Sequence, residues 1–86
     1  EMFIQVTRGV YVNKDRVRAV ISLNNITAKQ MRETASFSNK MFNLTYGAQA
    51  RSVIVTDSGH ILLLGEKANK VRQRLFKKKE QDQQSH

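Results

Sequence analysis

Residues 51–65, RSVIVTDSGHILLLG, decide how this chain folds. Two largely apolar runs, Ser52–Val55 and Ile61–Leu64, flank the turn-forming residues Asp57–Gly59. Apolar runs joined by a short loop with glycine predict a β-hairpin, and glycine at the third loop position can take the positive φ of a type I turn plus bulge. Because both runs are apolar at nearly every position, we expect both faces of the hairpin to be covered and the hairpin to form the centre of the core.

Four further stretches are predicted to be strands from their alternation of apolar and polar residues. They cover residues 2–7, 10–12, 16–23 and 41–46. Alternate side chains of a strand face the same side, so four apolar residues of 16–23 are expected to point inward: Val17, Ala19, Ile21 and Leu23. The same alternation places Arg16 and Arg18 next to each other on the solvent-exposed face of the strand, about 7 Å apart. These two cations are either part of a binding face or simply a solvated polar strand.

Two helices complete the expected fold. The sequence Thr27-x-x-Gln30 is typical of a capping box and predicts a short helix over residues 28–36. A second helix is predicted over residues 66–79, which carry many of the basic residues. Its apolar stripe consists of Ala68, Val71 and Leu75, supplemented by Phe76. The expected class is α+β: a small mixed or antiparallel β-strand domain with one short central helix and a C-terminal helix.

The length of 86 residues predicts one domain, which we place at residues 2–79, with a disordered tail at 80–86. Cysteine is absent, so disulfides and thiolate metal sites are excluded. The longest apolar run has four residues, which is too short for a transmembrane span or the core of a signal peptide. We therefore expect a cytoplasmic protein without a membrane partner.

The charge of the chain points to a polyanionic partner. Fifteen Lys and Arg residues against seven Asp and Glu give a net charge of +8 and an isoelectric point near 10.3. Nucleic-acid-binding domains commonly exceed an isoelectric point of about 9. Acidic lipid surfaces are less favoured, because only Phe76 could anchor the basic helix. The remaining alternative is a basic surface that is merely solvated.

No catalytic or metal-binding motif is present. The chain has no glycine-rich phosphate loop and no serine nucleophile with an evident base. His60 is the one histidine inside the expected fold, and a single histidine without a second ligand does not make a metal site. We expect a structural role for His60 and a turn-forming role for Asp57. The predicted protein is not an enzyme and uses no metal, cofactor or small-molecule substrate.

The order of these stretches resembles one known family. The segments FIQV, Arg16-Val17 followed by VIS, NLTYG, RSVIVTDSGHILL and VRQRL are similar to the extracellular matrix regulatory protein family, RemA and RemB, over about residues 3–75. The most specific block runs from Gly47 to Leu62. The resemblance implies a small bacterial DNA-binding protein with a fold like LytTR-type domains. It also implies a ring-shaped homo-oligomer on which duplex DNA can wrap, and activation of biofilm-matrix genes.

The resemblance also implies which residues contact DNA. In the RemA pattern these are an arginine that opens the second long strand and an Arg-Arg pair just after the central-loop glycine. Arg16 matches the first, but the pair falls on Ala48 and Gln49, which cannot grip phosphate as guanidinium groups do. Nearby cations and the basic terminal helix can compensate. The predicted DNA-binding residues are Arg8, Arg16, Arg18, Gln49 and Arg51.

Two functional alternatives remain open beside a DNA-binding regulator. The substitution of the arginine pair favours a structural or interaction ring that has lost DNA affinity. RNA binding is less favoured, because the chain has six aromatic residues and most of them sit in apolar patterns. If DNA is the partner, specificity should come mostly from repeated phosphate contacts and DNA bendability.

Overall fold

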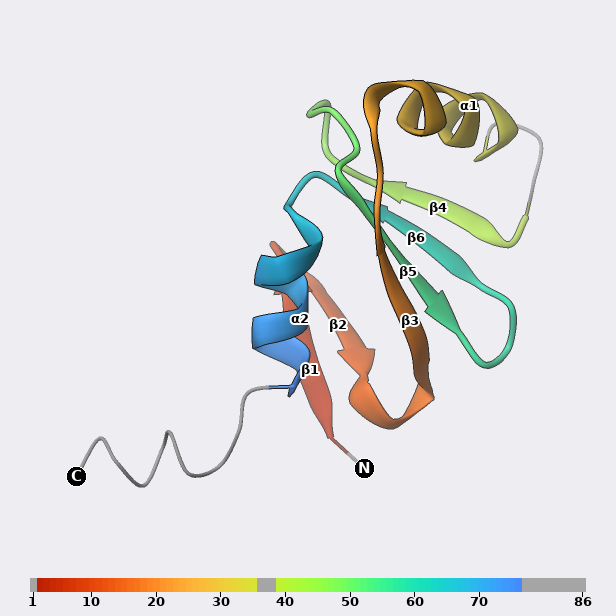
Figure 1. The fold of residues 1–86 in the computed structure, drawn as a ribbon. Helices are drawn as coiled ribbons and strands as arrows, with labels where there is room; N and C mark the ends of the chain where they lie inside the picture. Colours follow the sequence, from red (N-terminus) through yellow and green to blue (C-terminus); the bar gives the residue numbers. More distant parts are fainter. Residues whose placement is uncertain (1, 36–38, 77–86) are drawn as a thin grey trace.

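The computed structural model describes residues 2–35 and 39–76, and Figure 1 shows their arrangement. The elements in chain order are β1 (Phe3–Thr7), β2 (Val10–Asn13), the 3-10 turn η1 (Lys14–Arg16), β3 (Val17–Ser22), α1 (Asn25–Ala35), β4 (Met41–Leu44), β5 (Ser52–Thr56), β6 (Ile61–Leu64) and α2 (Ala68–Phe76). The predicted α+β class is confirmed. Neither described helix is long and apolar enough to cross a membrane.

The hairpin β5–β6 forms as its sequence predicts. The Gly59 N–H donates to the Thr56 carbonyl at 3.0 Å, and the Thr56 N–H donates to the His60 carbonyl at 3.0 Å. Gly59 takes a φ of +86°, which L side chains rarely adopt. This geometry is the three-residue loop that the position of the glycine predicts.

A four-stranded mixed sheet surrounds the hairpin, in the order β3-β5-β6-β4. Strand β5 is antiparallel to both β3 and β6, whereas the edge strand β4 runs parallel to β6. Strands β1 and β2 form a separate antiparallel pair. In Figure 1, β1, β2 and α2 lie together on one side of the four-stranded sheet, while α1 lies at the end where β3 finishes.

The two faces of the hairpin are buried in different clusters. One cluster joins Ile54 and Leu64 to β1, β2 and α2, through Val6, Val12, Val71 and Leu75. The other joins Val53 and Leu63 to Ala28 of α1 and to Ala50. Toward the turn, however, Val55, Ile61 and Leu62 are only half-buried. The expectation that both faces are covered is therefore confirmed for the half of the hairpin that is remote from its turn.

The predicted alternation of residues 16–23 is wrong at its start. Arg16 belongs to η1, and a bulge between Val17 and Ala19 interrupts the pairing of β3 with β5. A bulge shifts the side chains that follow it relative to those before it. Arg16 and Arg18 are therefore not regular neighbours on one strand face. Ile21, predicted to point inward, is 48% exposed.

Helix α1 begins earlier than predicted because a different residue caps it. The Thr27 N–H donates to Asn24 Oδ1 at 2.8 Å, and the Asn24 N–H donates to Thr27 Oγ1 at 3.0 Å. This reciprocal pair is a capping box with Asn24 at the N-cap and Thr27 three residues on. The predicted box, with Thr27 itself at the N-cap, is wrong by one turn.

Helix α2 buries the predicted stripe of Ala68, Val71 and Leu75. Phe76, expected to supplement this stripe, is 46% exposed. The fourth predicted strand also ends early, at Leu44, because Tyr46 takes a φ of +53° and leaves the extended conformation. Residue 36 of the first predicted helix, residues 77–79 of the second and the predicted disordered tail at 80–86 lie outside the described residues.

Candidate nucleic-acid interface

The loop before β5 is held firmly against the sheet. The Arg51 N–H donates to the Leu64 carbonyl at 2.8 Å, and the Arg51 carbonyl accepts from the Leu23 N–H at 3.0 Å. A Cβ at Gly65 would lie 3.1 Å from Ala48 Cβ, so the loop packs closely against this glycine. The Arg51 side chain itself is exposed. The hydrogen-bonded backbone of Arg51 thus presents an exposed guanidinium to solvent.

An open pocket of about 440 Å³ adjoins Arg51. Its wall includes Gln49, Asn25 and two cations of the α2 region, Lys67 and Arg72. Arg72 Nη1 donates to the Val20 carbonyl at 3.0 Å, which ties this guanidinium to β3. Gln49 Nε2 donates to Asn25 Oδ1. The sequence shows that the terminal helix is basic, but it does not predict that Lys67 and Arg72 line one pocket with Arg51, since the pocket joins distant segments.

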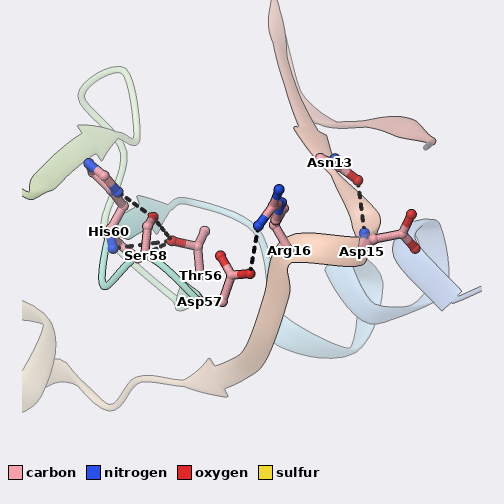
Figure 2. Close-up of polar contacts among 7 residues, drawn as sticks. All are labelled: Asn13, Asp15, Arg16, Thr56, Asp57, Ser58 and His60. Atoms are coloured by element: carbon pink, nitrogen blue, oxygen red, sulfur yellow. Dashed lines mark hydrogen bonds and ion pairs between the residues drawn. The ribbon is translucent and has the colours of Figure 1, made fainter.

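Arg16 lies at the end of β3 that is remote from Arg51, and it already forms an ion pair with Asp57. Arg16 Nη1 lies 3.2 Å from Asp57 Oδ2, and the Asp57 N–H donates to the Arg16 carbonyl at 2.9 Å. Figure 2 shows this pair beside the hairpin turn. The side chains of Arg16 and Asp57 are 65% and 39% exposed, so the pair contributes at most about 1 kcal/mol to stability. Asp57 nevertheless offsets the charge of Arg16.

Arg8 and Arg18 complete the predicted set. Arg8 lies in the turn between β1 and β2, and its carbonyl accepts from the Tyr46 hydroxyl at 3.1 Å. This bond ties the β1–β2 turn to the loop that carries Gln49 and Arg51. Arg18 is an exposed residue at the β3 bulge.

The structure therefore divides the predicted residues between the two ends of β3. Val17 pairs with Thr56, and Ser22 pairs with Ser52. At about 3.3 Å per residue, the positions of Arg16 and Arg51 are about 20 Å apart along the direction of these paired strands. The predicted residues form no single cluster.

Glu66 and Arg74 form a second ion pair, in addition to the pair of Arg16 and Asp57. Arg74 Nη2 lies 2.7 Å from Glu66 Oε1, while Arg74 Nη1 donates to the Val6 carbonyl at 2.8 Å. The hydrogen bond with Glu66 raises the pKa of Arg74 above its ordinary value. Arg74 is thus occupied by internal partners, and the Glu66 carboxylate is directed to it.

A polar network closes the hairpin turn. Ser58 Oγ lies 2.6 Å from His60 Nδ1 and 2.9 Å from Thr56 Oγ1, and the His60 N–H donates to Thr56 Oγ1 at 3.1 Å (Figure 2). The His60 ring also stacks on Phe42, with centroids 5.9 Å apart. Ser58 thus lies beside the imidazole of His60, a contact that the sequence analysis did not predict.

Each bond of this network joins residues two or four positions apart in one turn, so the network stabilises the hairpin. This agrees with the structural role predicted for His60. In the described part of the chain, no group of three or more His, Cys, Asp or Glu side chains could hold a metal ion.

Together these features define a small basic α+β protein with exposed cations on strand ends and a tightly held loop. The model of the RemA-like family, described as extracellular matrix regulatory protein A-like, matches residues 3–75. The chain belongs to this family, as the sequence resemblance predicts.

Relatives from several bacteria are similar to this chain. A protein of Syntrophobacter fumaroxidans is 40% identical over 68 residues, which cover 79% of this chain and 72% of the relative. A protein of Thermotoga petrophila is 34% identical over 73 residues, covering 85% and 79%. A protein of Shouchella clausii is 32% identical over 77 residues, covering 90% and 88%. The name of each begins "Putative regulatory protein".

Proposed function

We propose that this protein is a cytoplasmic DNA-binding transcriptional regulator of the biofilm-matrix type. It contacts the phosphates of duplex DNA as a ring-shaped homo-oligomer, with a fold of the LytTR type. Membership in a family of regulatory proteins supports the regulatory role. The observation that carries the DNA proposal is the exposed, backbone-anchored Arg51.

Arg51 suits phosphate contact for two reasons. Its main-chain N–H and carbonyl are both hydrogen-bonded, to Leu64 and Leu23, so the root of the side chain is already ordered. Among the described residues, carboxylates form ion pairs with Arg16 and Arg74, whereas none does so with Arg51. A guanidinium without a carboxylate partner is available for a bidentate contact with a phosphate.

Arg8, Arg16, Arg18 and Gln49 are the further contacts that we propose. The exposed Arg8 and Arg18 have, like Arg51, no ion-pair partner among the described residues. Arg16 can contribute fully only when a phosphate competes with Asp57. Since these residues lie at both ends of β3, each subunit would touch separated phosphates along the duplex.

Exposed apolar side chains support self-association. Phe3 and Tyr11, on the paired strands β1 and β2, are 61% and 62% exposed. Large apolar residues left open on a small domain favour contact with another copy. Size-exclusion chromatography with light scattering at several concentrations should give a multimer, and a monomer at every concentration would contradict the ring.

Binding of duplex DNA at rising salt tests the central proposal. Fluorescence anisotropy should show log affinity falling linearly with log salt, and Arg51→Gln should reduce the slope by about 0.9, the value for one phosphate contact. Absence of binding even at low salt would refute the proposal. A single-stranded RNA of equal length should bind more weakly, and preference for that RNA would favour the RNA alternative.

A second candidate function is an assembly module without DNA affinity. The observation in its favour is that two predicted contacts have internal partners, Arg16 with Asp57 and Gln49 with Asn25. The double variant Ala48→Arg/Gln49→Arg distinguishes the two functions. If it creates DNA binding where the parent has none, the parent is an assembly module; if the parent already binds, the module is excluded.

A further inference from the structure

We propose that the pocket between Arg51 and the start of α2 is a phosphate-binding site built from Arg51, Lys67 and Arg72. These three cations come from the loop before β5, the residue before α2 and the body of α2. Neither Lys67 nor Arg72 belongs to the predicted set of DNA contacts. The ligand is a phosphate group, carried either by the DNA backbone or by a small phosphorylated molecule.

The charges around this pocket are not balanced by the protein. No Asp or Glu is among the described residues that line it. Glu66 immediately precedes Lys67, but its carboxylate lies 2.7 Å from Arg74 Nη2, in a contact outside the pocket wall. Like charges that converge without a counter-charge repel one another. A bound anion removes this repulsion.

Lys67 occupies a position where the helix favours an anion. Its carbonyl accepts from the Lys70 N–H at 3.0 Å and from the Val71 N–H at 3.2 Å, which makes it the N-cap residue of α2. A lysine there supplies no acceptor for the first amides and adds charge to the positive end of the helix dipole. In the described part of the chain, no hydrogen bond satisfies the amides of Ala68 and Asn69. A phosphate in the pocket would supply both the acceptor and the negative charge.

Part of the pocket wall is ordered in advance for such a ligand. Arg72 is tethered to the Val20 carbonyl, and the Arg51 backbone is held on both sides. The Gln49 amide is bonded to Asn25 Oδ1, which leaves the Asn25 amide nitrogen as a donor. Ordered donors lose less entropy when they bind, and two planar guanidinium groups match the oxygen geometry of phosphate. The volume of about 440 Å³ has room for a phosphate group with part of the molecule that carries it.

Titration of the full chain with inorganic phosphate tests the site. Two-dimensional NMR at constant ionic strength, with chloride as the compensating anion, should show saturable shifts of the Ala68 and Asn69 amides. Lys67→Gln should weaken this binding by about tenfold or more, as expected for loss of one charged hydrogen bond. The matched control is Lys70→Gln, which removes the same charge from an exposed residue outside the pocket wall. It should bind phosphate like the parent.

The outcomes separate this proposal from the function proposed above. Absence of saturable shifts, or equal weakening in both variants, overturns the phosphate site. The DNA measurement, which rests on the proposed function, identifies the source of the phosphate. If the salt slope of DNA binding falls by about 0.9 in Lys67→Gln but not in Lys70→Gln, the phosphate belongs to the DNA backbone. If the slope of Lys67→Gln equals that of the parent, while the parent binds inorganic phosphate, the ligand is a free phosphorylated molecule. Phosphate binding without any DNA binding contradicts the proposed DNA-binding function but supports the phosphate site.

Discussion

Replacement of Asp57 by asparagine should strengthen DNA binding, because it frees Arg16. In the native protein, Asp57 Oδ2 lies 3.2 Å from Arg16 Nη1 and offsets its charge. The substitution keeps the size of the side chain. It also leaves intact the main-chain bond of 2.9 Å from the Asp57 N–H to the Arg16 carbonyl. Because the ion pair is largely exposed, its loss should cost at most about 1 kcal/mol of folding stability.

The size of the effect follows from counterion release. One additional phosphate contact steepens the dependence of log affinity on log salt by about 0.9. If parent and variant bind equally at about 1 M salt, this slope corresponds to about eightfold tighter binding at about 0.1 M salt. Fluorescence anisotropy with one duplex at four or more salt concentrations measures both quantities.

Asp15→Asn is the matched control for this experiment. Asp15 lies in η1 next to Arg16, and its substitution changes the net charge by the same amount. Asp15 forms no ion pair with any other residue that the structure describes. It should alter the slope much less than Asp57→Asn does. Equal slopes in the two variants, or no change from the parent, would show that Arg16 is not a phosphate contact held back by Asp57.

Three predictions concern the scaffold that carries these cations. Ile54→Ala should lower the free energy of unfolding by about 2–5 kcal/mol in urea, because Ile54 is fully buried, whereas the exposed Ile26→Ala should change it by less than about 0.5 kcal/mol. Gly65→Ala should lower the melting temperature, with a cost of about 1–3 kcal/mol, since the added Cβ would lie 3.1 Å from Ala48 Cβ. Adding Ala48→Gly should restore it, and failure to restore would refute this packing argument. Asn24→Ala should cost about 1 kcal/mol through loss of the N-cap of α1, and unchanged thermal unfolding would place the cap elsewhere.

Part of the candidate site was predictable and part was not. The exposure of Arg8, Arg18 and Arg51 follows from basic residues at turns and strand ends, which water solvates readily. The close approach of Ser58 and His60 carried a local signal, a serine two residues before a histidine in a hairpin turn. The roles of Arg8, Arg18 and Arg51 in DNA binding stay predictions. The ion pair of Arg16 with Asp57 carried no such signal, because 41 residues separate the two.

The sequence by itself determined the hairpin, the α+β class, the buried stripe of α2 and the family, because each depends on local pattern. Turn chemistry and apolar period act over a few residues and are legible in the chain. Tertiary structure alone decided where β3 bulges and which half of the hairpin is covered. It also brought Arg51, Lys67 and Arg72 to one pocket. Those outcomes depend on how β5 pairs with β3 and how α2 returns to the sheet, and no local pattern encodes contacts between such distant segments.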